Sequence, residues 1–109
     1  MWKICIEDPF LNCHLIYPIQ QKKVKAMIDG ILSKYGNTVS RIIVFGSSVT
    51  NRCHIGSDVD LFVETEEKHL SLPAAVSFAY DLWSSSMADD RIRNEIYKTG
   101  VIVYDKNAT

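Results

Sequence analysis

Residues 44–64 read VFGSSVTNRCHIGSDVDLFVE, and the rest of the chain can be laid out around them. An apolar run ends at Gly46-Ser47, a polar segment follows, and a second apolar run opens with Asp58 and Asp60. Because side chains alternate between the faces of a strand, the two carboxylates are expected on one face, about 7 Å apart. At an effective dielectric constant of about 20 they repel each other by about 2 kcal/mol. The pair therefore predicts a cation site.

The length and composition are those of an ordinary globular domain. With 109 residues, 47% hydrophobic and 23% charged, we expect one domain over residues 1–109, with 1–17 as an N-terminal extension and 106–109 as a flexible tail. The net charge of −1 does not indicate binding to nucleic acid. Three cysteines are an odd number, and no signal peptide or long apolar segment is visible. This predicts a cytoplasmic protein with free thiols and no membrane contact.

A long amphipathic helix is predicted to begin at Pro18, a residue that suits the first turn, and to end at Gly36. Gly36 is expected to close it in the left-handed conformation. Lys22, Lys23 and Lys25 lie off the apolar face and are expected in solvent. That face consists of residues spaced three and four apart: Val24, Met27, Ile28, Ile31, Leu32 and Tyr35.

The strands are predicted from short apolar runs, at Trp2–Ile6, Val39–Phe45, 58–64 and Val101–Tyr104. A helix over Arg91–Thr99, capped by Asp89 or Asp90 and ended by Gly100, precedes the last of them. Val76–Trp83 is typical of a further strand, although Pro73–Tyr80 also fits a short helix. Strands that alternate with helices predict an α/β or α+β domain.

Gly46-Ser47 has the character of an anion-binding turn. Glycine allows a ligand to approach the backbone, Ser47 adds a hydroxyl group, and N–H groups at a strand-to-helix turn point toward bound phosphate. Either Gly-Ser or Asp-x-Asp alone is weak evidence for a binding site. Here the two motifs are flanked by buried strands and are separated by a short polar segment. Together they predict that one element holds phosphates and the other a hard divalent cation such as Mg²⁺.

With these residues the chain resembles the nucleotidyltransferases of the DNA polymerase β superfamily, specifically the minimal (MNT) type. Their motif is Gly-Ser, a short loop, and Ser-Asp-x-Asp at the start of a strand, which Gly46-Ser47 and Ser57-Asp58-Val59-Asp60 match. Residues 95–104 are similar to the closing helix, glycine and strand of the family, so the resemblance covers about residues 24–104. It implies a small mixed β-sheet flanked by helices. Asn51 departs from the family pattern, which usually has glycine there.

The resemblance also implies two Mg²⁺ ions, or Mn²⁺ in their place, bound by three carboxylates. Asp58 and Asp60 supply two of them. The third comes from a strand with the pattern hydrophobic-Asp-Leu, which Asp81 matches in Tyr80-Asp81-Leu82. The interval between Asp60 and Asp81 is short for a helix between two strands. If Asp81 lay on the surface after a helix, the set would be incomplete.

By the same resemblance, a nucleoside triphosphate, with ATP as the first candidate, would bind at the Gly-Ser turn. Gly46 and Ser47 would hold the β- and γ-phosphates, and Ser57 would also belong to the nucleotide site. Arg52 would add a positive charge near the triphosphate, although a solvated loop residue is the simpler interpretation. Trp83 and its aromatic neighbours are expected in a core or an interface rather than under a base.

The reaction implied is in-line attack of an acceptor hydroxyl, expected to be one on a protein, at the α-phosphate, with release of pyrophosphate. Asp81 would assist deprotonation of the acceptor. In the family the usual partner is a helical HEPN-type protein, with the MNT protein as antitoxin of a toxin–antitoxin pair, so a homodimer or hetero-oligomer is expected. The alternative is a catalytically weak or inactive binding or antitoxin subunit with the same fold. Cys13-His14 and Cys53-His54 lack the spacing of a zinc site.

Overall fold

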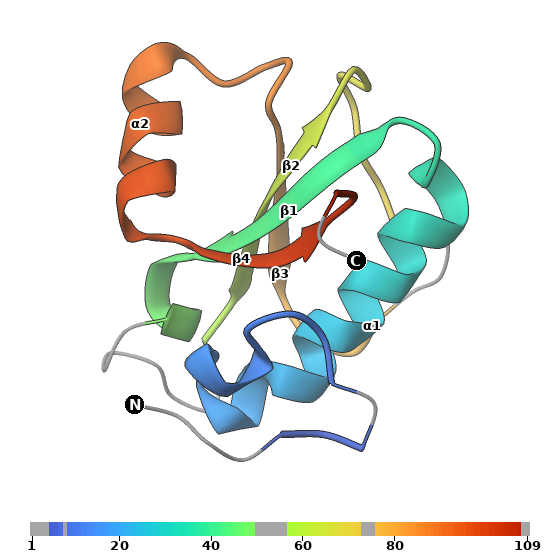
Figure 1. The fold of residues 1–109 in the computed structure, drawn as a ribbon, viewed down its shortest axis with the longest axis vertical. Coiled ribbons are helices and arrows are strands. Elements are labelled where there is room, and N and C mark those ends of the chain that lie inside the picture. Colours follow the sequence, from blue (N-terminus) through green and yellow to red (C-terminus); the bar gives the residue numbers. More distant parts are fainter. Residues whose placement is uncertain (1–4, 8, 50–56, 73–75, 108–109) are drawn as a thin grey trace.

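The computed structural model describes residues 5–7, 9–49, 57–72 and 76–107, which form a mixed sheet with two helices (Figure 1). The helices are α1 (Pro18–Tyr35) and α2 (Asp90–Thr99), and the strands are β1 (Val39–Phe45), β2 (Val59–Thr65), β3 (Tyr80–Ser84) and β4 (Val101–Asp105). Two short 3-10 turns, η1 (Cys13–Leu15) and η2 (Gly46–Val49), precede α1 and follow β1. The strand order is β3-β2-β1-β4, with β1 antiparallel to β2 and β4 and with β2 parallel to β3. The predicted fold class is therefore confirmed.

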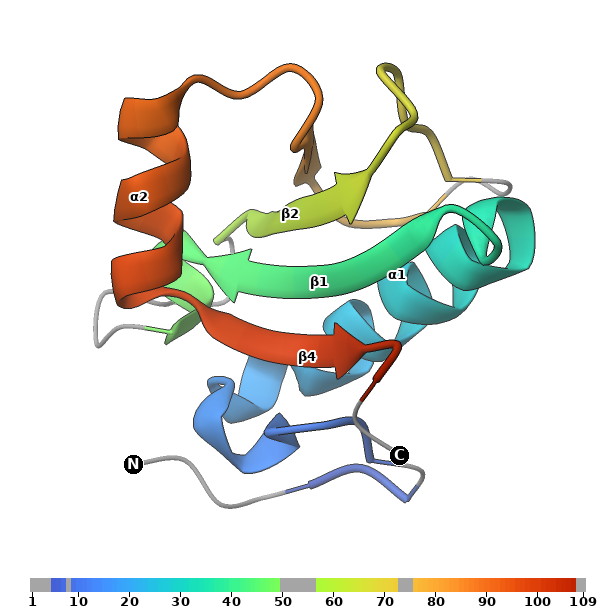
Figure 2. The same cartoon turned by 45° about the horizontal axis from the view of Figure 1, so that its top comes forward.

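The sheet buries apolar side chains on both faces because one helix packs on each side. On one face, the apolar stripe of α1 packs against Ile42 and Val44 of β1 and Leu61 of β2. On the other, Ile96 of α2 packs against Ile43 and Phe62. In Figure 2, α1 passes behind β1 and β4. Alternate residues of β1 and β2 thus belong to different cores, as their continuous apolar runs require.

The long helix is confirmed, but its predicted end at Gly36 is wrong in one respect. Gly36 has φ −49° and ψ −34°, which is right-handed rather than left-handed. Its N–H donates to the Leu32 carbonyl oxygen at 3.0 Å, so helical bonding continues through it. The chain turns one step later, where the N–H of Thr38 donates to the Tyr35 carbonyl at 2.9 Å. No left-handed residue is needed at this position.

The interval between Asp60 and Asp81 is short for a helix, and the described part of the connection from β2 to β3 contains none. Residues 76–79 form no helix, and β3 begins at Tyr80 rather than at Val76. Residues 73–75, which include the start of the alternative helix, lie outside the described residues. Leu70, Leu72 and Phe78 pack on the α1-side core, so a loop covers this part of the sheet in place of the helix usual between parallel strands.

The predicted N-cap of α2 is confirmed, whereas the strand predicted near the N-terminus stays a prediction. The Asp89 carboxylate accepts a hydrogen bond from the N–H of Ile92 at 2.9 Å, which confirms Asp89 as the N-cap of α2. The strand predicted at Trp2–Ile6 falls mostly outside the described residues, and its last two residues, Cys5 and Ile6, are not in a strand. None of the helices in the described segments combines the length and apolar character that crossing a membrane requires.

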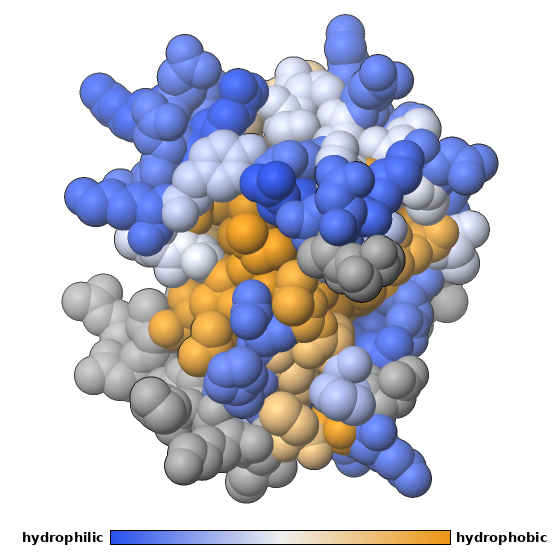
Figure 3. Space-filling model, in the orientation of Figure 1, coloured by the Kyte–Doolittle hydropathy of each residue, from blue (hydrophilic) through white to orange (hydrophobic). Residues whose placement is uncertain are grey.

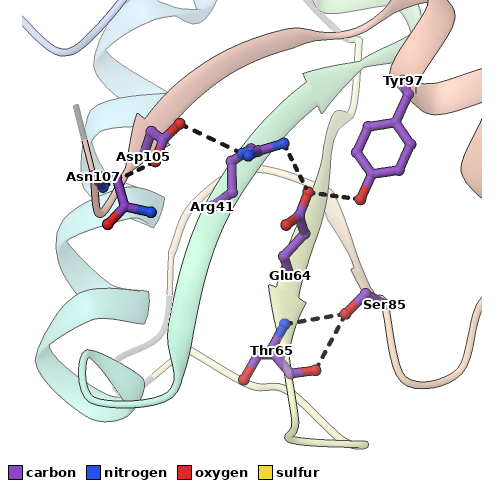
Figure 4. Close-up of polar contacts among 7 residues, drawn as sticks. All are labelled: Arg41, Glu64, Thr65, Ser85, Tyr97, Asp105 and Asn107. Carbon is purple, nitrogen blue, oxygen red and sulfur yellow. Dashed lines mark hydrogen bonds and ion pairs between the residues drawn. The ribbon is translucent and has the colours of Figure 1, made fainter.

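A polar network centred on Glu64 joins α2 to the end of β2 that lies away from Asp60 (Figure 4). The Tyr97 hydroxyl donates to Glu64 at 2.6 Å, and Arg41 lies 3.4 Å from Glu64 and 3.5 Å from Asp105. Burial, with Glu64 as the second cause, raises the pKa of Tyr97 to about 12. A neutral tyrosine that donates to a carboxylate therefore joins α2 to the sheet, which holds the helix in a set position over this face.

Candidate active site

Asp60 and Asp81 lie side by side in the structure. Asp60 is the second residue of β2, Asp81 is the second residue of β3, and the parallel register of the two strands makes them direct partners. Asp58 directly precedes β2 and is exposed. The sheet thus places Asp60 beside Asp81 at the end where β2 and β3 begin, with Asp58 two positions ahead of Asp60.

The Asp60 carboxyl is electrostatically strained by its surroundings. Burial raises its pKa to about 6 from an ordinary 3.8, with further contributions from the charge of Asp81, the hydrogen bond between the two carboxyl groups, and the charge of Asp58. Each of these causes disfavours the ionised form. A bound cation would remove the penalty, because it attracts all three carboxylates at once.

The raised pKa predicts that the metal-free protein loses stability as the pH rises. The folded chain holds the Asp60 proton more tightly than the unfolded chain, so the stabilising contribution is full below pH 3.8 and is lost as the pH passes about 6. Thermal melts without divalent ions at about pH 5 and about pH 7.5 should give the lower melting temperature at the higher pH. The difference should shrink in Asp60→Asn, and an equal difference in both proteins would contradict the assignment.

Gly46 brings the other half of the motif against the same carboxylate. It has a φ of +77°, and a Cβ atom added to it would lie 2.5 Å from Oδ2 of Asp60. Both the backbone conformation and the contact therefore require glycine here. Phe45, just before it, is the cross-strand partner of Asp60. Gly46 and the aspartates, twelve or more positions apart in the chain, thus form one continuous site.

The sequence profile of one family, described as polymerase beta nucleotidyltransferase, matches residues 26–109, which is most of the chain. The chain belongs to this nucleotidyltransferase family. The expected superfamily is thereby confirmed, whereas the minimal subtype is a finer assignment that this match leaves as a proposal. A comparison with curated protein sequences found no match.

Of the other residues predicted to hold a nucleotide, two lie within the described part of the chain and one does not. Ser47 lies half-buried in η2, and Ser57 is buried immediately before Asp58. Arg52 falls outside the described residues, as do Asn51 and the Cys53-His54 pair. Within the described segments, the ion pairs of lysine and arginine involve other acidic residues and none of the three aspartates.

The residues present fit a divalent cation by their chemistry. Carboxylate oxygens are the ligands that Mg²⁺ prefers, and Asp58, Asp60 and Asp81 carry three carboxylates without a basic partner in the described part of the chain. No three acidic, histidine or cysteine side chains of the described residues already converge on one point.

An apolar groove of about 440 Å³ opens beside the carboxylates. Phe45 and Trp83 form its floor, with ring centroids 6.4 Å apart, and side chains of α2 form its wall. Trp83 follows Asp81 by two positions, so the two side chains share a face of the sheet. The indole is 40% exposed, so Trp83 lies at the surface of this groove and outside the buried core. A separate polar cleft of about 480 Å³ surrounds Glu64 and Tyr97, and none of the three aspartates lines it.

Sequence reasoning missed one residue that touches both halves of the site. Gln20, in the first turn of α1, is fully buried and donates from Nε2 to the hydroxyl of Ser48 and to the carbonyl of Ser57. The signal was present in the sequence, since Gln20 lies four positions before Val24 and continues the apolar stripe of the helix with a polar residue. The bonding partners are distant in sequence, and periodicity alone does not reveal them.

Proposed function

We propose that this domain transfers a nucleoside monophosphate from a nucleoside triphosphate to a hydroxyl group on an acceptor protein. ATP is the first candidate for the nucleotide. The observation that carries the proposal is the pairing of Asp60 with Asp81 on neighbouring strands, against Gly46 and near Asp58. Family membership supports nucleotidyl transfer in general. The aspartates would hold two Mg²⁺ ions, or Mn²⁺, as metal ligands.

The proposed reaction exchanges one phosphorus–oxygen bond for another. The acceptor oxygen forms a bond to the α-phosphorus, the bond from that phosphorus to the oxygen bridging to the β-phosphate breaks, and pyrophosphate leaves. When bound, the divalent ions would neutralise the phosphate charge and lower the pKa of the acceptor hydroxyl. Asp81 would orient that hydroxyl and receive its proton. Gly46, Ser47, Ser57 and Arg52 would hold the triphosphate in line.

A partner protein is part of the proposal. The described residues contain one sheet and two helices, which leave the face of the carboxylates open beside the groove. At the sheet edge formed by β4, apolar side chains gather on the surface (Figure 3). Apolar surface of this kind is typical of protein interfaces. We propose a second copy or a helical HEPN-type protein as partner, with this chain as the MNT antitoxin. The free thiols of Cys5 and Cys13 are in keeping with the proposed cytoplasmic location.

Ligand-induced stabilisation tests the proposal directly. Mg²⁺ or Mn²⁺ with ATP should raise the melting temperature of the wild type by mass action, and it should not raise that of Asp58→Ala/Asp60→Ala. Labelled ATP should then transfer its nucleotide to an acceptor protein in the presence of the wild type only. Stabilisation without transfer would favour the inactive binding subunit. Absence of any shift would overturn the nucleotide site itself.

The apolar groove gives a further expectation about the nucleotide. The groove begins at Phe45, next to the proposed phosphate turn, and its aromatic lining suits a flat base. In a Trp2→Phe background, which leaves Trp83 as the sole tryptophan, Mg²⁺ with ATP should quench the indole fluorescence. Mg²⁺ with tripolyphosphate, which lacks the base, should leave the fluorescence unchanged. Equal quenching by both ligands would exclude stacking on Trp83.

A further inference from the structure

Two glutamines occupy the buried face of α1, where apolar residues are expected. Gln20 is 0% exposed and Gln21 1%. In each, Oε1 has no hydrogen-bond partner among the described residues. A buried amide oxygen without a partner costs stability, and an aliphatic side chain would fill the same space without that cost. The role of each glutamine therefore lies in the bonds that its Nε2 group donates.

The two Nε2 groups reach different parts of the molecule. Nε2 of Gln20 donates to the carbonyl of Ser57 at 3.1 Å and approaches the hydroxyl of Ser48 at 3.3 Å. Ser48 lies in the Gly-Ser turn and Ser57 directly precedes Asp58, so a single amide group joins the phosphate half of the motif to the aspartate half. Nε2 of Gln21 donates to the carbonyls of Cys13 and Ile16, both at 3.1 Å, and so anchors the segment before α1.

A second hydrogen bond, from the backbone at the start of α1, also holds the Gly46–Val49 turn. The backbone N–H of Tyr17 donates to the Ser48 carbonyl at 3.0 Å, and the N–H of Gln20 donates to the Tyr17 carbonyl at 2.8 Å. The first turn of the helix, the Gly-Ser turn and the approach to β2 therefore meet at the Gln20 side chain. Since that side chain is fully buried, it contacts no ligand and acts only through its neighbours.

We propose that Gln20 is a positioning residue of the nucleotide site, whose side-chain amide sets the placement of the Gly46–Val49 turn relative to Asp58. The inference rests on the proposed function, because it assigns the two joined segments to phosphate and to metal. Without the amide, Ser57 and Ser48 lose a shared donor, so the position of one segment relative to the other is less closely fixed. Misplacement of reacting groups by about 1 Å costs about 100-fold in rate.

Gln21 supplies a matched control, since it has the same side chain, burial, number of donated bonds and unpartnered oxygen. Gln20→Met and Gln21→Met should lower the melting temperature by similar amounts. In equilibrium titrations of the full chain, Gln20→Met should bind Mg²⁺ with ATP about 10-fold or more weakly than the wild type, whereas Gln21→Met should bind it normally. Equal affinities of the two variants would overturn the positioning role.

A measurement on the wild type covers the case in which Gln20→Met does not fold. In the ¹⁵N spectrum, Mg²⁺ with ATP should shift the side-chain amide signals of Gln20 and leave those of Gln21 in place. Unshifted Gln20 signals in a protein that binds the nucleotide would refute the inference alone. A wild type that binds no nucleotide would refute the proposed function and the inference with it.

Discussion

Asp60→Asn is expected to reduce nucleotide transfer by about 100-fold or more while it stabilises the metal-free protein. The loss follows because Asp60 lies between Gly46 and Asp81, where a phosphate-bridging cation would bind, and groups that stabilise developing charge contribute about this much. The gain follows because the neutral amide escapes the burial and repulsion that raise the pKa of Asp60. Since the carboxyl is only partly buried, we expect a gain of about 1 kcal/mol near neutral pH.

Transfer of labelled nucleotide and chemical denaturation, both at about pH 7.5, measure the two effects in one preparation. Asp29→Asn is the matched control, since it removes the same charge from the exposed side of α1, where Asp29 pairs with Lys25 at 2.9 Å. It should leave transfer unchanged and should not stabilise the protein. If Asp60→Asn kept full transfer, the carboxylate pair would not be the catalytic site. A destabilised Asp60→Asn would show that the carboxylate makes a structural bond.

Gly46→Ala should both destabilise the fold and weaken nucleotide binding. A left-handed conformation costs a residue with a Cβ atom about 1–2 kcal/mol, and that atom would also lie 2.5 Å from the Asp60 carboxylate. Either the turn or the aspartate must move, so a loss of about 2–3 kcal/mol in the free energy of unfolding is expected. Binding of Mg²⁺ with ATP should fall further than this loss of folded protein explains, because phosphate and metal ligands shift relative to each other.

Gly30→Ala separates these effects from the general cost of replacing glycine. Gly30 lies within α1 and has a negative φ, because Gly46 is the one described glycine with a positive value. Alanine should be neutral or slightly stabilising there, because it favours the helix over the unfolded chain. Gly46→Ala with wild-type stability and affinity would mean that the turn adapts freely and that its contact with Asp60 has no role in the site.

Local features of the sequence were sufficient to predict most of the elements. The spacing of apolar residues predicted α1 and β1, and the Asp89-Asp90 pair before a polar helix predicted a cap of α2, which the structure assigns to Asp89. Gly46 between an apolar strand and a serine-rich turn was assigned to a turn, and its positive φ agrees. These signals depend on residues within a few positions of one another, so they can be recognised without knowledge of the tertiary contacts.

Long-range contacts decided the rest. Asp81 becomes the partner of Asp60 through the parallel register of β2 and β3. The same packing buries Asp60 and raises its pKa, joins Gln20 to both halves of the motif, and leaves Trp83 beside the carboxylates. The sequence alone indicated which residues are candidates for the chemistry. Only the folded sheet determined which of them are neighbours, because hydrogen-bond register and burial arise from segments far apart in the chain.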